Sequence, residues 1–256
     1  MQRIGQEIGI IIKSPREIAI MREAGRVVAA VIEALTKTVK PGVTTGELDE
    51  VADKELKKHG AVSAFKGYRG FPASICTSIN EEVVHGIPGS RILKSGDIIS
   101  LDVGAILDGF YADAAVTLAV GKISAEAQKL IETTEGALQA GIAAARSGAR
   151  LGDISAAIQS YVEFGNFSVV REYVGHGVGR DLHEDPQIPN FGIAGEGHLL
   201  RRGMSLALEP MVNAGDWRTK IADNKWTVST IDGRLSAHFE HTIAITDGGP
   251  EILTMR

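Results

Sequence analysis

The sequence predicts an α+β protein built from two related halves, in which antiparallel strands pack against helices. Three observations carry this prediction. Segments with apolar residues at helical spacing alternate with short apolar segments of strand character, a hairpin turn is expected at Asp108-Gly109, and short motifs recur about 106 residues apart. Motifs that recur at a constant offset, with the same order of elements around them, indicate an internal duplication.

Four helices are expected along the chain. Ser14-Pro15-Arg16-Glu17 is a capping box followed by helical spacing through Leu35, and this helix stops near Pro41-Gly42. A second capping box, Thr44 to Glu47, opens a shorter helix that ends at His59-Gly60. The third helix runs from a Ser124 cap through Ala145, and the fourth from Asp153 to Phe164. Side chains that cap free backbone groups define where these helices begin.

The stretch from Gly96 to Ala115 predicts a β-hairpin, because Asp-Gly suits the two left-handed positions of a type I′ turn. With that turn, Asp113 faces Gly104 and is diagonal to Asp102, so both carboxylates share one face of the sheet. Diagonal neighbours lie roughly 7 to 8 Å apart. Two carboxylates in an apolar setting stay ionised only with a cation, so the hairpin predicts a metal site.

Further strands are expected after these elements. Ser74–Ile79 and Phe167–Val174 have strand character, whereas Gly175–Gly179 is interpreted as flexible. Met204–Val212 and Phe239–Thr246 are apolar runs that one glutamate interrupts in each case.

The duplication has a chemical consequence. Gly42–Leu48 resembles Gly148–Ile154, and Leu93–Asp102 resembles Leu200–Glu209. We therefore expect a single catalytic domain over residues 1–256, with halves at about 14–120 and 121–250 and no extra domains. Asp102 and Glu209 then occupy equivalent strands, with Asp113 and Glu240 on the strands that follow. Four converging carboxylates require divalent cations, and His176 can add an imidazole ligand. The alternative is that each acid points into water, as most strand carboxylates do.

Composition excludes several classes of protein. The formal net charge is −5 and no Lys/Arg run exceeds two residues, so nucleic-acid binding is not expected. The single cysteine, Cys76, excludes an intrachain disulfide and fits a reducing compartment. The apolar segment Ile8–Ile12 is too short for a signal sequence or a membrane span. The protein is expected to be cytoplasmic.

The motifs together resemble the type I methionine aminopeptidase family from Ile12 to the C-terminus. The resemblance rests on Asp102 and Asp113 and on the segments Glu81–Pro88, Gly175–Gly179, His183–Pro186, Glu209–Val212 and Glu240–Thr242. It implies the pita-bread fold, a curved antiparallel sheet covered by helices in pseudo-two-fold halves. It also implies metal-dependent removal of the N-terminal methionine from nascent polypeptides whose second residue is small.

The resemblance implies a two-metal site. Its ligands are Asp102, Asp113, His176, Glu209 and Glu240, with Asp113 and Glu240 bridging two divalent ions, which can be Co, Mn, Fe or Zn. A hydroxide that bridges the ions attacks the scissile carbonyl, and Glu209 is the candidate general base.

Two further histidines are implied to contact the substrate. His183 donates to the scissile carbonyl oxygen, and His85 contacts the substrate near the amide. His183 could instead belong to a solvated turn. The methionine pocket is implied to be lined by Tyr68, Phe71, Cys76 and Trp226, although aromatic residues and cysteine are most often core. Phe65 departs from a smaller residue in some relatives, which affects the depth of this pocket.

The remaining histidines receive other roles. His238 shares a face with Glu240 and is expected to support the ligands, whereas His241 is expected to be structural. His59 and His198 are expected at the surface.

The implied partners are nascent peptide N-termini, with the ribosome as a further candidate, and the protein is expected to be a monomer that binds neither nucleic acid nor membrane. An X-Pro aminopeptidase or prolidase is the alternative enzyme, disfavoured because those enzymes usually carry a large extra N-terminal domain. An inactive peptide-binding member of the fold is the other alternative, disfavoured because all five ligand positions are filled.

Overall fold

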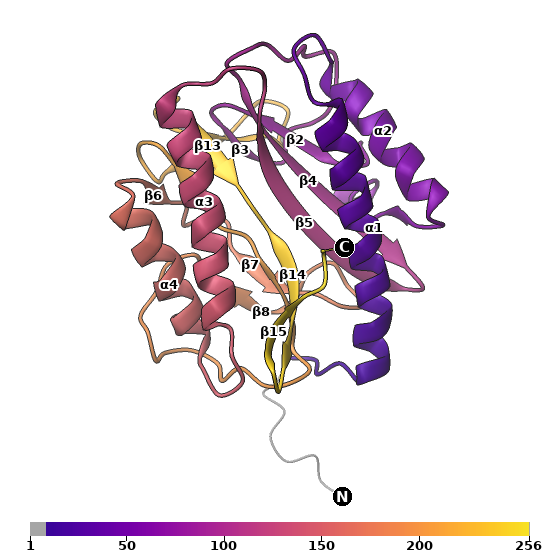
Figure 1. The fold of residues 1–256 in the computed structure, drawn as a ribbon, viewed down its shortest axis with the longest axis vertical. Coiled ribbons are helices and arrows are strands. Elements are labelled where there is room, and N and C mark those ends of the chain that lie inside the picture. Colours follow the sequence, from indigo (N-terminus) through magenta and orange to yellow (C-terminus); the bar gives the residue numbers. More distant parts are fainter. Residues whose placement is uncertain (1–8, 256) are drawn as a thin grey trace, which may run out of the picture.

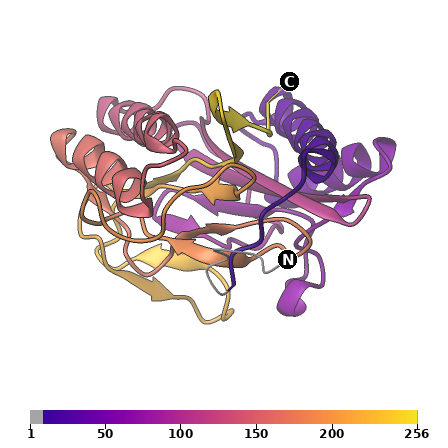
Figure 2. The ribbon, with the colours of Figure 1, turned by 90° about the horizontal axis from the view of Figure 1, so that it is seen from below.

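The helices lie on one face of the strands. The structure is a computed structural model that describes residues 9–255. Its helices are α1 (Pro15–Thr38), α2 (Thr45–Lys58), α3 (Ala125–Ala144), α4 (Leu151–Phe164) and the short 3₁₀ turn η1 (Tyr68–Gly70). The pair α1 and α2 and the pair α3 and α4 flank the central strands (Figure 1). Figure 2 shows α1 to α4 above the strands, whereas η1 lies below them together with loops and short strands.

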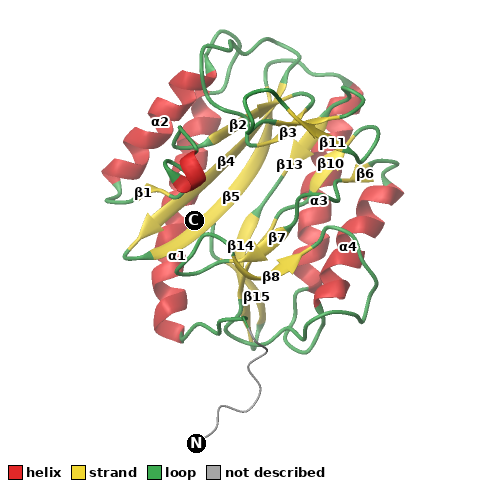
Figure 3. Cartoon of the chain, turned by 180° about the vertical axis from the view of Figure 1, so that it is seen from behind, coloured by secondary structure: helices red, strands yellow, loops and turns green. Residues whose placement is uncertain are grey.

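The strands form an antiparallel arrangement. The first half contributes β1 (Val62–Ser63), β2 (Cys76–Ile79), β3 (Glu82–Val84), β4 (Ile98–Leu107) and β5 (Phe110–Ala119). The second half contributes β6 (Ser168–Val169), β7 (Gly175–Gly177), β8 (Glu184–Ile188), β9 (Ser205–Leu208), β10 (Met211–Asn213), β11 (Thr219–Ile221), β12 (Val228–Thr230), β13 (Ser236–His238), β14 (His241–Thr246) and β15 (Gly249–Ile252). The main sheets have the orders β1-β4-β2, with β5 beside β4, and β15-β14-β9-β7-β8. Two smaller sheets, β13-β10-β6 and β11-β12-β3, lie toward the upper right of Figure 3, at the end of the molecule away from β15.

The predicted hairpin is confirmed in register. Leu107 pairs with Phe110 across Asp108 and Gly109, whose φ angles are +49° and +76°, as a type I′ turn requires. Asp113 pairs with Gly104, and Asp102 pairs with Ala115. The two aspartates therefore lie on one face of the β4–β5 pair.

The duplication is visible in equivalent contacts. The backbone N–H of Gly42 donates to the carbonyl of Leu93, and that of Gly148 donates to the carbonyl of Leu200, each at 2.9 Å. Isolated bridges join the same loops in both halves, Thr44 with Ile92 and Arg150 with Leu199. Each half thus ties the start of its second helix to the loop that precedes its central strands.

Each half has its own apolar core, and the halves meet at β5 and β14. One core joins α1 and α2 to β2, β4 and β5, and the other joins α3 and α4 to β9, β13 and β14. Between β5 and β14, the N–H of Glu240 donates to the carbonyl of Ala115 at 2.9 Å, and the N–H of Ala115 donates back at 3.3 Å. This junction places the segments that carry Asp113 and Glu240 side by side.

Sequence-based expectations differ from the structure in the second half. Only Ser168–Val169 of the expected strand 167–174 is a strand, and the segment expected to be flexible contains β7. Helix α4 begins at Leu151, two residues before the expected start. The capping boxes of α1 and α2 are confirmed. Between residues 9 and 255, no helix is long and apolar enough to cross a membrane. The segment Ile8–Ile12 lies partly outside the described residues.

Candidate metal centre and substrate cavity

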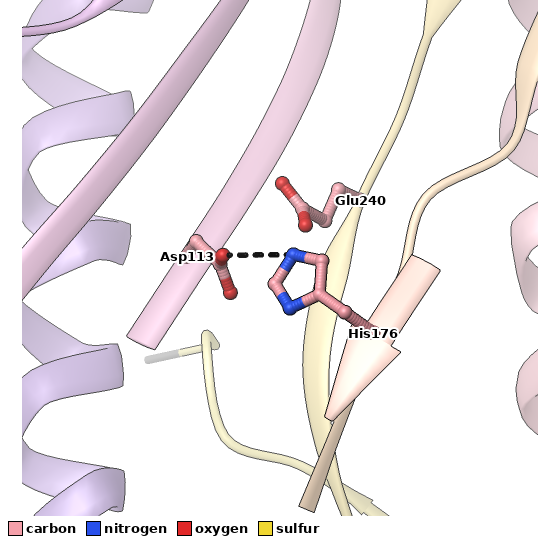
Figure 4. Close-up of side chains that lie close together, drawn as sticks. All are labelled: Asp113, His176 and Glu240. Carbon is pink, nitrogen blue, oxygen red and sulfur yellow. Dashed lines mark ion pairs between the residues drawn. The ribbon is translucent and has the colours of Figure 1, made fainter. Parts of the chain in front are cut away.

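Three buried side chains from separate segments of the chain meet at the junction of the halves. They are Asp113 from β5, His176 from β7 and Glu240 immediately before β14, and their ligand atoms all lie within 4.8 Å of one another (Figure 4). Nε2 of His176 is 3.6 Å from Oδ2 of Asp113. Two carboxylates and one imidazole at this spacing can hold a divalent cation.

Asp102 and Glu209 extend this cluster. Oε1 of Glu209, which follows β9, lies 3.4 Å from Nε2 of His176, and the Glu209 side chain is 14% exposed. Oδ1 of Asp102 is buried and has no hydrogen-bond partner among the described residues. A buried carboxylate oxygen without a donor is costly unless a cation lies against it, so the donor set fits a metal.

Burial raises the pKa of all four acidic side chains. For Asp102 and Glu209 burial is the main cause, and neighbouring carboxylates add to it. Glu240 is affected in the same way, whereas the rise at Asp113 is opposed by His176 and by the Thr242 hydroxyl. At neutral pH this cluster becomes fully ionised only when cations neutralise it.

The backbone around His176 fixes the ring. Nδ1 of His176 donates to the carbonyl of Gly177 at 3.0 Å, which leaves Nε2 with a free lone pair toward the acids. A Cβ at Gly175 would lie 2.4 Å from the carbonyl oxygen of Ala207, and one at Gly177 would lie 2.2 Å from that of Asp185. These glycines therefore permit close strand packing, which is why a segment expected to be flexible is β7.

The five acidic and imidazole groups open into a cavity of about 300 Å³. Its apolar wall holds Phe71 and Trp226 edge to face, with ring centroids 5.2 Å apart. Cys76 pairs with Asp102 across β2 and β4, and burial raises the pKa of its thiol. All residues expected in the site line this cavity: Tyr68, Phe71, Cys76, His85, Asp102, Asp113, His176, His183, Glu209, Trp226 and Glu240.

The two histidines outside the acidic cluster differ in their contacts. His183 lies with its ring centroid 4.4 Å from that of His176, and its Nδ1 is 2.8 Å from the Tyr68 hydroxyl. Burial and the nearby His176 lower the pKa of His183 to about 4. The ring of His85 packs edge to face on Tyr173 at 5.8 Å, and burial lowers the pKa of His85. Both imidazoles are therefore neutral at pH 7 and can donate from one nitrogen.

The other histidines lie in different surroundings. Nε2 of His238 is 3.9 Å from Oε2 of Glu209, and it has no hydrogen-bond partner within residues 9–255. Nδ1 of His241 is 2.8 Å from the Thr254 hydroxyl, away from the cluster. His59 and His198 are exposed.

Three residues that the sequence did not single out also line the cavity: Arg69, Tyr173 and Leu182. Arg69 follows Tyr68 and Leu182 precedes His183 in the sequence, so their position next to a candidate residue could have indicated that they line the cavity. Tyr173 was assigned to a strand, and nothing local marked its side chain as facing the cavity. Phe65, considered only for pocket depth, lines the cavity as well.

The chain is similar to known metallopeptidases along nearly its whole length. The model of "Metallopeptidase family M24" matches residues 19–247. A curated protein of Bacillus subtilis, "Methionine aminopeptidase 1", is 60% identical over 96% of this chain and 99% of its own length. The "Methionine aminopeptidase" of Clostridium acetobutylicum is 56% identical over 96% of this chain and 99% of its own length.

Solved structures agree with the sequence comparisons. The methionine aminopeptidase of Rickettsia prowazekii superposes with a TM-score of 0.95 at 46% identity, over 96% of this chain and all of that one. A prolidase from Pyrococcus furiosus shares the fold with a TM-score of 0.76, but it is 22% identical and is covered over 66% of its length. The pita-bread fold expected from the motifs is confirmed.

Proposed function

The chain belongs to metallopeptidase family M24 and is a metal-dependent methionine aminopeptidase, and we propose that its active site is the acid-lined cavity at the junction of β5 and β14. The observation that carries this proposal is the convergence of five ligand-type side chains from both halves beside an apolar pocket. Such a cavity joins a hydrolytic centre to a binding site for one apolar side chain. The prolidase-like and inactive alternatives are not favoured, because the high identities over nearly full length are to methionine aminopeptidases.

The enzyme uses divalent metal, and we propose that two ions bind. Asp102, Asp113, His176, Glu209 and Glu240 would hold them, and Co, Mn, Fe and Zn all accept this donor set. When bound, the ions supply Lewis acidity that lowers the pKa of a water molecule and withdraws charge from the scissile carbonyl.

The remaining steps belong to side chains of the chain. Glu209 would take a proton from the attacking water and return it to the leaving amine. His183 donates a hydrogen bond to the carbonyl oxygen as that oxygen gains charge. His85, held against Tyr173, contacts the substrate near the scissile amide.

The methionine side chain is proposed to enter the pocket formed by Tyr68, Phe71, Cys76 and Trp226. The T-shaped pair of Phe71 and Trp226 offers ring edges and faces to a thioether, which makes favourable contacts with aromatic rings. The Cys76 thiol stays protonated because burial raises its pKa, so it acts as a small apolar wall.

The proposal extends to the location, oligomeric state and partners of the protein in the cell. We propose a cytoplasmic monomer of one catalytic domain that acts on nascent chains with a small second residue, with the ribosome as a candidate partner. The negative net charge gives no support for nucleic-acid binding.

The test is peptide hydrolysis after metal removal. Chelated protein should release no methionine from Met-Ala-Ser, and added Mn²⁺ or Co²⁺ should restore release. Asp113→Asn should abolish it, whereas Asp216→Asn, on an exposed loop, should leave it unchanged. Wild-type turnover by Asp113→Asn would contradict the proposed ligand role, and preference for Ala-Pro-Ala over Met-Ala-Ser would contradict the substrate.

A further inference from the structure

The Tyr68 hydroxyl makes a hydrogen bond inside the cavity that substrate binding does not require. It lies 2.8 Å from Nδ1 of His183, and the two rings are tilted by 37° with centroids 5.4 Å apart. Within residues 9–255 the hydroxyl makes no other hydrogen bond. A residue that only formed a wall of an apolar pocket would not need this polar contact.

Chemistry sets the direction of this bond. A phenol hydroxyl is a better donor than acceptor, and an imidazole nitrogen with a lone pair is a strong acceptor. The favoured arrangement is therefore O–H of Tyr68 donating to Nδ1 of His183. A neutral imidazole carries one proton, so that proton then resides on Nε2.

The turn that carries Tyr68 is built to hold it. Gly67, Arg69 and Gly70 have φ angles of +87°, +48° and +89°. The N–H of Gly67 donates to the carbonyl of Phe71 at 2.8 Å, and the N–H of Phe71 donates to that of Tyr68 at 2.9 Å. These backbone bonds lie within the turn η1 itself and hold Tyr68 without a backbone bond to the segment that carries His183, so the hydroxyl is a preformed support.

Apart from the Tyr68 hydroxyl, the His183 ring has an aromatic contact but no polar partner within residues 9–255. Its ring lies 4.4 Å from that of His176, tilted by 55°, a contact that limits rotation without choosing a tautomer. Only the Tyr68 hydroxyl, among the contacts of the ring in the described residues, distinguishes Nδ1 from Nε2.

We propose that Tyr68 is a positioning residue whose hydroxyl holds His183 in the Nε2–H tautomer, so that an N–H rather than a lone pair faces the scissile carbonyl oxygen. This inference rests on the proposed function of the cavity. It assigns to Tyr68 a role in catalysis through His183, in addition to its place in the methionine pocket. Loss of the hydroxyl should then affect kcat more than KM.

The direct test is the protonation pattern of the ring. Protein with ¹⁵N-labelled histidine is loaded with diamagnetic Zn²⁺, and the His183 signals are assigned by their loss in His183→Gln. We expect a pyrrole-type Nε2 and a pyridine-type Nδ1 in the wild type, and shifts averaged between tautomers in Tyr68→Phe. A pyrrole-type Nδ1 in the wild type, or identical shifts in both proteins, would overturn the proposal.

Kinetics provide the second measurement. With Met-Ala-Ser, Tyr68→Phe should lower kcat about three- to tenfold, the range expected for one neutral hydrogen bond, with KM within about twofold of the wild type. Tyr161→Phe removes the same hydroxyl from the exposed face of α4 and should leave both constants unchanged. An unchanged kcat in Tyr68→Phe contradicts the positioning role, whatever happens to KM. If the wild-type protein released no methionine, the proposed function would fail, while the nitrogen shifts would still decide the tautomer.

Discussion

The hydroxyl of Thr242 lies 2.8 Å from Oδ1 of Asp113, and the backbone N–H of Asp113 donates to the same hydroxyl at 3.0 Å. Thr242 belongs to β14 and Asp113 to β5, so a single side chain of one half orients a proposed ligand of the other. A ligating carboxylate is held in place by such partners, which also tune its affinity for metal.

Replacing this hydroxyl should weaken metal binding. Thr242→Val keeps the shape of the side chain and removes its hydrogen bonds, and we expect the affinity for Mn²⁺ to fall about 10- to 100-fold in a calorimetric titration. Thr242→Ser retains the hydroxyl and should remain close to the wild type. Equal affinities for the valine and serine variants would show that Thr242 does not orient Asp113.

Metal should stabilise the protein more at higher pH. The folded, metal-free protein has raised pKa values at Asp102, Glu209 and Glu240, so it holds protons that the unfolded chain has already lost. Its carboxyl cluster therefore contributes less stability as pH rises above about 4. Bound cations displace these protons, and apparent affinity should rise about tenfold per pH unit for each proton displaced.

Thermal unfolding of chelated and Mn²⁺-loaded protein between pH 5 and 8 measures this coupling. The gain in Tm on adding Mn²⁺ should increase across that range. A gain that does not change with pH would mean that the carboxyls are already ionised in the metal-free fold.

Gly86 should not tolerate a side chain. A Cβ there would lie 1.9 Å from the carbonyl oxygen of Thr77. The backbone N–H of Thr77 donates to the carbonyl of Gly86 at 2.8 Å, so the two segments are held at this distance. Gly86→Ala should lower the free energy of unfolding by about 1 to 3 kcal/mol and reduce kcat/KM, because His85 is the adjacent residue. Gly89→Ala is the matched control, since a Cβ at Gly89 meets no atom within 4 Å. Similar urea midpoints for both variants would disprove the steric argument.

The ion pair between Lys13 and Glu184 should contribute to stability, because both charged groups are buried and each needs the other as a partner. The two side chains are only 3% and 4% exposed, and Glu184 also accepts from the backbone N–H of Arg180 beside the His183 segment. Lys13→Met leaves a buried carboxylate without its cation and should cost about 3 to 5 kcal/mol of unfolding free energy. The double variant Lys13→Met/Glu184→Gln should recover most of that loss. If the double variant were as unstable as the single one, the loss of unfolding free energy would come from packing of the lysine side chain and not from the unpaired carboxylate.

Local chemistry made part of this protein predictable. The Asp108-Gly109 turn fixes the register of β4 and β5, and that register places Asp102 and Asp113 on one face before any tertiary contact is known. Capping boxes located the first two helices for a similar reason, since the bonds span only three residues. The shared face of Asp102 and Asp113 therefore follows from short-range geometry, whereas the other proposed metal ligands were predicted from the repeat and the family resemblance.

Other features could not be predicted from the sequence, because they depend on contacts between residues far apart in the chain. The glycines around His176 are present because Ala207 and Asp185 approach them, and neither neighbour is close in sequence. Thr242 was not singled out as a partner of Asp113, because the two residues are 129 positions apart. Tyr173 likewise depends on how its segment packs against His85. Features of this kind need the folded arrangement of both halves.

The junction of β5 and β14 has a consequence for biosynthesis. Asp102 and Asp113 are synthesised long before Glu240, and the backbone bonds between Ala115 and Glu240 cannot form until the second half has been made. Contacts of such sequence separation are also slow to close during folding. A growing chain that lacks β14 therefore carries only part of the acidic cluster, and hydrolytic competence arises late, after most of the polypeptide has been translated.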